Sequence, residues 1–170
     1  MSKNASLHDK DFYGWAMRSA ELIRHGRFDE IDRESLADEI EGMGKSKRCE
    51  LFRLLGQAFA SIIKYEYLSD TDPDTISRWR KDAEVFHENG MNVLKKNPGL
   101  KGNIPEILDE SWNMARSEVY RSFPQFVKKC DLDKIGIPQH CPWTIEQVLS
   151  GEILPEGPDD QSNPFAKLRP

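Results

Sequence analysis

The apolar residues from Leu51 to Ile63 recur with the period of an α-helix, and this pattern constrains the fold more than any other feature of the sequence. Counted from Leu51, they fall at offsets of 0, 3, 4, 7, 8, 11 and 12 residues, which places them on one helical face. A β-strand would alternate every second residue instead. We therefore expect a central helix from Ser46, as N-cap, to about Tyr67.

Two helices are expected before the central one. The first starts at Asp11 and ends at Gly26, which suits the left-handed position after a helix. Its expected inner face consists of Phe12, Trp15, Ala16, Ala20 and Ile23. The second is capped by Asp32 and ends at Gly42 and Gly44. Its expected core face consists of Leu36, Ile40 and Met43.

Start and stop signals of the same kind predict three further helices. The first runs from Asp72, an N-cap followed by Pro73, to Lys95, with a kink or fraying expected at Gly90. The second runs from Asn103 to just before Pro124. The third runs from Ile145 to Leu149, behind a capping box at Thr144–Gln147, and is closed by Gly151. The sequence thus predicts an all-α fold, a compact multi-helix bundle of about five main helices plus a short C-terminal helix. We expect one domain over residues 7–156 and a flexible, polar, proline-rich tail over 157–170.

Composition narrows the functional classes. No apolar run approaches the roughly 20 residues that cross a bilayer, so a membrane-spanning role is excluded. The N-terminus lacks the apolar segment of a secretory signal, and three widely spaced cysteines form no disulfide framework, so we expect a cytoplasmic protein. The net charge of −5 gives no strong signal for nucleic-acid binding.

An acidic motif on the second expected helix is the most suggestive polar feature. Glu39 flanks the expected core face, and Asp38 and Glu41 point further outward. Several carboxylates on one turn could hold a hard divalent cation and activate water. Alternatively, they form a solvated face in which Glu39 pairs with a cation. Lys64 is the natural partner, and Arg24 and Arg27 are the other candidates. These six residues form the candidate polar site.

Other chemistry finds little support in the sequence. The four histidines lack zinc-ligand spacing, and no CxxC, phosphate loop, GxGxxG or GxSxG motif occurs. Cys141 follows His140, but nothing indicates a lowered pKa for its thiol. The basic stretch Lys45, Lys47 and Arg48 could touch phosphates, although a solvated helix surface is the simpler interpretation. We therefore expect no cofactor and no resident metal.

Seven short motifs occur in order along the chain. They are Asp11-Phe-Tyr-Gly-Trp15, Gly26-Arg-Phe28, Asp38-Glu-Ile-Glu-Gly-Met-Gly44, Lys64-Tyr-Glu-Tyr67, Asn97-Pro-Gly-Leu100, Cys141-Pro-Trp-Thr-Ile-Glu-Gln147 and Leu154-Pro-Glu156. In combination they resemble the bacterial domain of unknown function 29 family over about Leu7 to Glu156. The resemblance implies an all-helical domain and no established activity. Family members usually carry a histidine where this chain has Ser61, and commonly Glu where it has Asp38.

Two functions of different classes follow. The absence of a complete catalytic constellation favours a non-enzymatic helical protein-interaction module, with a protein partner or a second copy as its ligand. The alternative is a metal-dependent hydrolase, acting on a substrate such as nucleic acid through the acidic motif around Glu39. Carboxylates that converge on an open pocket would indicate the hydrolase, whereas carboxylates paired with cations would indicate the module.

Overall fold

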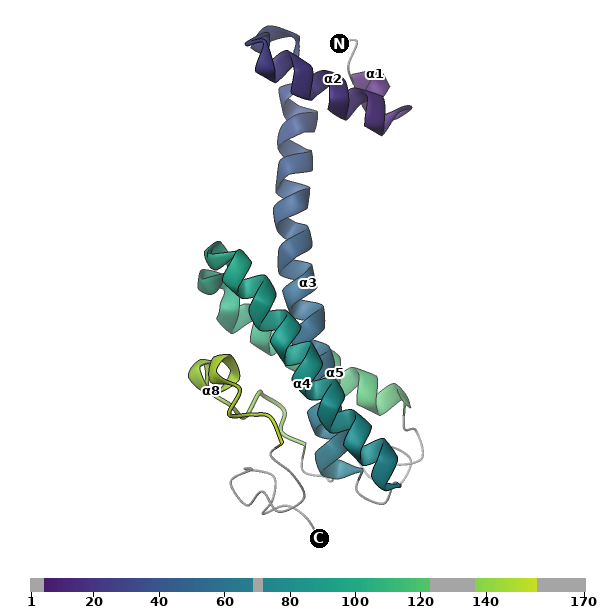
Figure 1. The fold of residues 1–170 in the computed structure, drawn as a ribbon, viewed down its shortest axis with the longest axis vertical. Helices are drawn as coiled ribbons and strands as arrows, with labels where there is room; N and C mark the ends of the chain where they lie inside the picture. Colours follow the sequence, from purple (N-terminus) through teal and green to yellow (C-terminus); the bar gives the residue numbers. More distant parts are fainter. Residues whose placement is uncertain (1–4, 69–71, 123–136, 156–170) are drawn as a thin grey trace. The chain divides into compact units, whose positions relative to one another are not determined.

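The computed structural model describes residues 5–68, 72–122 and 137–155, and all regular structure within them is helical (Figure 1). The elements are α1 (Ala5–His8), α2 (Phe12–Arg24), the 3-10 turn η1 (Phe28–Glu30), α3 (Arg33–Tyr67), α4 (Pro73–Lys96), the 3-10 turn η2 (Pro98–Asn103), α5 (Ile104–Ser122) and α8 (Ile145–Ser150). The expected all-α fold is confirmed. The expected tail over 157–170 lies outside the described residues.

The chain forms two compact units, residues 1–46 and 47–170, which we call unit 1 and unit 2. Helix α3 is continuous from one to the other. Unit 2 contains most of α3 together with α4, η2, α5 and α8. Unit 1 contains α1, α2, η1 and the first turns of α3.

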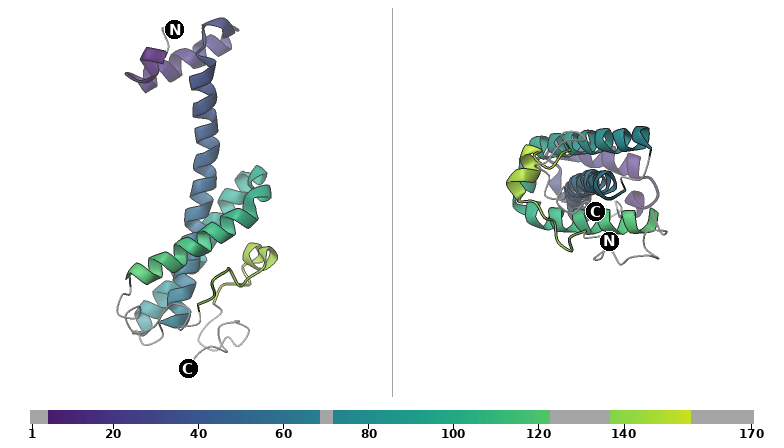
Figure 2. Two further views of the ribbon diagram at one scale, coloured as in Figure 1. Left: turned by 180° about the vertical axis from the view of Figure 1, so that it is seen from behind. Right: turned by 90° about the horizontal axis from the view of Figure 1, so that it is seen from below.

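The expected spine of the fold is confirmed in unit 2. Leu51, Phe59 and Ile62 of α3 are completely buried, as are the other spine positions Leu55 and Ile63. Seen end-on, α3 lies between α4 and α5 (Figure 2). Those two helices contribute apolar residues to the same core, which also takes in residues from the C-terminal segment. The helical period predicted this helix because a face that is apolar over three turns must be covered by other elements.

The C-terminal segment is held on this core by aromatic contacts and a buried hydrogen bond. Trp143 stacks on Phe59, with ring centroids 5.8 Å apart, and meets Trp112 edge-on at 5.5 Å. Helix α8 follows the predicted capping box, and Gly151 ends it with a φ of 83°. His87 of α4 donates from Nε2 to the carbonyl of Val148 at 2.6 Å. These contacts dock the C-terminal segment on the bundle.

Two expectations about glycine were wrong. Gly42 and Gly44 do not end a helix, because α3 runs through both of them and Ser46 is an interior residue instead of a cap. A helical glycine costs about 1 kcal/mol relative to alanine but does not forbid the helix. Neither glycine takes the positive φ that ends a helix at Gly26. The Glu41–Lys45 ion pair, 3.0 Å across one turn, also bridges this stretch.

Gly90 likewise leaves α4 unbroken, and the helix continues to Lys96. The residue is buried against the spine of the core. A Cβ atom at this position would lie 3.6–3.7 Å from side-chain atoms of Leu51, Leu54 and Leu55. These are ordinary van der Waals distances, so Gly90 lies where α4 packs on α3, and a methyl group would fit there without a clash.

In unit 1, the bounds of α2 were predicted correctly, but of the large residues on its predicted inner face only Trp15 is buried. Asp11 caps the helix by accepting from the backbone N–H of Gly14 at 2.9 Å, and Gly26 follows with a φ of 69°. The buried residues are Trp15, Ser19 and Leu22, whereas Phe12 and Ile23 are exposed. The buried face is thus rotated from the expected one, with the small Ser19 at its centre.

Candidate functional site

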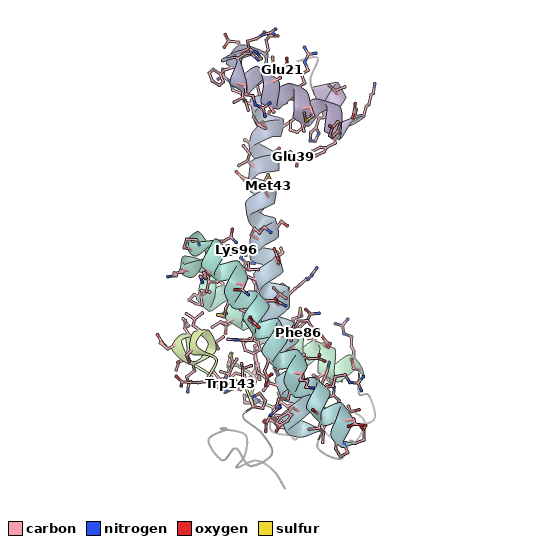
Figure 3. All side chains as sticks on the ribbon, viewed as in Figure 1. Glu21, Glu39, Met43, Phe86, Lys96 and Trp143 are labelled. Carbon is pink, nitrogen blue, oxygen red and sulfur yellow. The ribbon has the colours of Figure 1, made fainter. Side chains whose placement is uncertain are left out.

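Glu39 has a partner that sequence reasoning missed. It lies on α3 (Figure 3), and its Oε1 is 2.9 Å from Nε2 of His8 on α1. The His8 ring meets Trp15 edge-on, with centroids 4.6 Å apart. The hydrogen bond to Glu39 raises the pKa of His8, because the protonated ring donates to a carboxylate. This pair ties α1 to α3 within unit 1. Spacing could not reveal it, since the two residues are far apart in the sequence.

The other members of the candidate polar site are not brought to Glu39. Lys64 lies near the far end of α3 and donates to Oε1 of Glu118 on α5 at 2.7 Å, so the expected Glu39–Lys64 pair does not form. Arg27 donates twice to Glu30, at 2.6 and 2.7 Å. Arg24 is exposed in the last turn of α2. The six residues therefore do not form one cluster.

The two remaining carboxylates lie on the surface of α3. Asp38 is exposed, and Glu41 is exposed and paired with Lys45. Among residues 5–68, 72–122 and 137–155, no group of three or more His, Cys, Asp and Glu side chains has the arrangement of a metal site. The structure therefore places these carboxylates in surface ion pairs or in water, with nothing that favours the hydrolase.

Cys141 is also a poor candidate for covalent chemistry. Its side chain is half-buried beside Trp143, and burial raises the pKa of its thiol. A raised pKa keeps the sulfur protonated at neutral pH, whereas the thiolate is the nucleophile. Cys141 therefore acts in packing, in contact with the apolar core of unit 2.

The basic stretch on α3 is engaged in ion pairs. Lys47 donates to Glu50 at 2.8 Å, within the same helix. Arg48 reaches α5 and donates to Glu110 at 3.0 Å, with Glu106 at 3.4 Å. Lys47 and Arg48 therefore form surface ion pairs, and the pair of Arg48 with Glu110 links α3 to α5 within unit 2.

An apolar groove in unit 1 is the most distinctive surface of that unit. It has a volume of about 600 Å³ and is formed by the end of α2, the η1 turn and the first turns of α3. The apolar residues that line it are Ile23, Phe28, Ile31, Leu36, Ala37 and Ile40. We call this surface the apolar groove. Ile40 is 61% exposed, Phe28 55% and Ile23 43%.

The exposure of the first turns of α3 corrects the sequence interpretation of two residues. Ile40 and Met43 were expected in the core, but both are strongly exposed. Their helical spacing is the same for a face that packs inside the protein and for one that receives a partner, so periodicity alone does not separate the two. Most of the exposed large hydrophobic residues that the structure describes belong to unit 1: Phe12, Tyr13, Met17, Ile23, Phe28, Ile40 and Met43.

Comparison with known proteins places the chain in a family. No curated protein and no solved structure matches it. In the part of the chain that the structure describes, no helix combines the length and apolar character that crossing a membrane requires. A family model described as "Domain of unknown function DUF29" matches residues 7–154, across both units and nearly the whole chain. The chain therefore belongs to the DUF29 family of domains of unknown function.

Proposed function

We propose that this protein is a non-enzymatic interaction module, and that its apolar groove in unit 1 receives an amphipathic helix of a partner protein. The observation that carries the proposal is the exposure of Ile23, Phe28 and Ile40 around one concave surface. Isolated exposed hydrophobic residues are ordinary, but a group of them that lines a groove is typical of a binding site. Covering such a surface removes apolar area from water and so favours association.

The shape of the surroundings favours a helical ligand. The residues that the structure describes contain no β-strand, so they offer no sheet edge to which an extended peptide could add. The groove is bounded by α2 and α3, and a volume of about 600 Å³ holds a few large side chains. A helix presents such side chains at a spacing of three and four residues, which is the usual pattern of anchors in a helical groove.

Charge indicates the polar flank of that ligand. Residues 1–46 contain seven Lys and Arg and ten Asp and Glu, so unit 1 carries an excess of three negative charges. Glu34 is exposed and neighbours Ala37, a residue of the groove, at a helical spacing of three. Two charges in this area are already offset, since Arg33, which also lines the groove, pairs with Asp29 at 3.5 Å, and Glu41 pairs with Lys45. A partner helix with basic residues beside its apolar face would therefore be attracted and oriented.

Two further observations are consistent with this proposal. Within the described residues, the acidic motif does not have the grouping of ligands that the metal-dependent hydrolase alternative needs. Cys49 is a free, exposed thiol, which suits a reducing compartment such as the cytoplasm that we propose for this protein.

The test is site-specific photo-crosslinking in the native host. A photoreactive residue replaces Phe28 at the edge of the groove, and mass spectrometry maps the segment of the partner to which it is joined. We expect a segment with apolar residues at helical spacing and with Lys or Arg beside them. The change Ile40→Glu should abolish the crosslink, whereas Val85→Glu, at another exposed apolar residue in unit 2, should leave it unchanged.

Three results would contradict the proposal. A crosslink that persists in Ile40→Glu would show that the groove is not the contact surface. A crosslink between two copies of this chain would assign the groove to self-association. A crosslink to a segment without helical periodicity would exclude a helical ligand. The melting temperature of Ile40→Glu should equal that of the parent protein, because Ile40 is exposed, and this control separates lost binding from lost folding.

A further inference from the structure

A second groove, unlike the first, lies in unit 2 between α3 and the C-terminal half of α4. Its volume is about 720 Å³, within the range of ligand sites in proteins. Lys47 and Glu50 of α3 line one side, and Lys96 of α4, labelled in Figure 3, lines the other. We call it the polar groove. It is separate from the apolar groove, and nothing in the proposed function uses it.

The polar groove has an excess of positive charge. Glu50 is its acidic member, and Lys47 donates to it at 2.8 Å. This hydrogen bond, with the nearby charges of Lys47, Arg53 and Lys96, holds the pKa of Glu50 below its usual value. The carboxylate is thus ionised and offset by Lys47. Lys96 is exposed and has no ion-pair partner among the described residues, so its charge is open to a ligand.

The same wall of α4 offers amide groups. Asn89 and Asn92 line the groove, are exposed, and lie three residues apart, so they occupy the same side of the helix. Each side-chain amide provides both donors and an acceptor, as a peptide backbone does. Between the polar groups, Leu54 and Val93 are half-buried and give the groove an apolar floor that can cover one hydrophobic side chain.

These features together select one class of ligand. We propose that the polar groove binds an extended acidic peptide segment: a carboxylate pairs with Lys96, backbone amides bond to Asn89 and Asn92, and an apolar side chain rests on Leu54 and Val93. A polyphosphate fits less well. The carboxylate of Glu50 and the end of α4, whose last carbonyl groups carry the negative end of the helix dipole, repel every anion, and they repel a dense polyanion more strongly than a peptide that places a single carboxylate on Lys96.

The experiment measures binding of a short fluorescent peptide, in which glutamates flank one leucine, to the full chain by fluorescence anisotropy. Lys96→Glu should weaken binding by about five- to tenfold, since it turns an attraction into a repulsion. Lys95→Glu is the matched control: it makes the same change of charge at the neighbouring exposed residue of the last turn, which does not line the groove. It should weaken binding by less than about twofold.

Two more arms complete the test. Asn92→Ala changes no charge and should still weaken binding of the peptide by about threefold, because the variant lacks the side-chain amide that bonds to the peptide backbone. Inorganic polyphosphate should not displace the peptide at the same concentration of charge. The proposal is overturned if the parent chain does not bind the peptide, or if Lys95→Glu weakens peptide binding as much as Lys96→Glu does. It is also overturned if Asn92→Ala leaves peptide binding unchanged, or if polyphosphate binds more tightly than the peptide.

Discussion

Replacing Ile62 by alanine should destabilise unit 2 strongly. Ile62 has no exposed surface and lies in the core cluster with residues of α4 and α5. The substitution removes three carbon atoms, worth about 2.4 kcal/mol at roughly 0.8 kcal/mol for each buried carbon. The cavity that remains adds to this loss, so the free energy of unfolding should fall by about 3–4 kcal/mol, within the usual range for such substitutions.

The assay is urea unfolding followed by circular dichroism, with Ile40→Ala as the matched control. Ile40 is the same residue type on the same helix but is 61% exposed, so its replacement should change the free energy by less than about 0.5 kcal/mol. The reasoning is refuted if Ile62→Ala remains within about 1 kcal/mol of the parent protein, or if both variants lose the same stability.

Three further predictions concern local features. The hydrogen bond that the protonated His8 ring donates to its glutamate partner raises the pKa of His8. The stability that this pair contributes is therefore complete below about pH 6.5 and is lost as the pH rises through the raised pKa. An NMR titration of the ring should give a midpoint above 6.5, and a lower midpoint would contradict the pair. Gly42→Ala and Gly44→Ala should each raise the free energy of unfolding by up to about 1 kcal/mol, because both residues are helical and a Cβ atom there meets nothing within 4 Å. A lower melting temperature in either variant would argue against a continuous α3. His87→Phe should cost about 1–3 kcal/mol in urea unfolding, since the buried carbonyl of Val148 loses its donor, and an unchanged stability would argue against that bond.

Much of the helical layout could be predicted from local signals. The spine from Leu51 to Ile63 follows from its period, since a face that is apolar over several turns requires a cover. The caps at Asp11, Asp72 and Thr144 follow from side chains that can accept from the first backbone N–H groups of a helix. These signals act within a few residues, so they can be recognised without knowledge of tertiary structure.

The remaining features depend on tertiary contacts. Whether Gly42 ends a helix is decided by the backbone conformation of that residue, and its φ is not fixed by the residue type. The exposure of Ile40 depends on whether another element covers it. His8 pairs with Glu39, which lies thirty-one residues further along the chain, and Lys64 pairs with Glu118, fifty-four residues further along. Neither pair therefore produces a local sequence pattern. The two grooves likewise combine residues from separate elements.

The claim on which the whole account depends is that α3 is one helix, with a buried second half that forms the spine of unit 2. Amide hydrogen exchange, resolved by residue, tests it most directly. The amides from Leu51 to Ile63 should exchange most slowly in the chain, while residues 40–46, which are helical but exposed, should exchange faster and still be protected relative to an unfolded peptide. Rapid exchange within the spine, or unprotected amides around Gly42 and Gly44, would contradict the account.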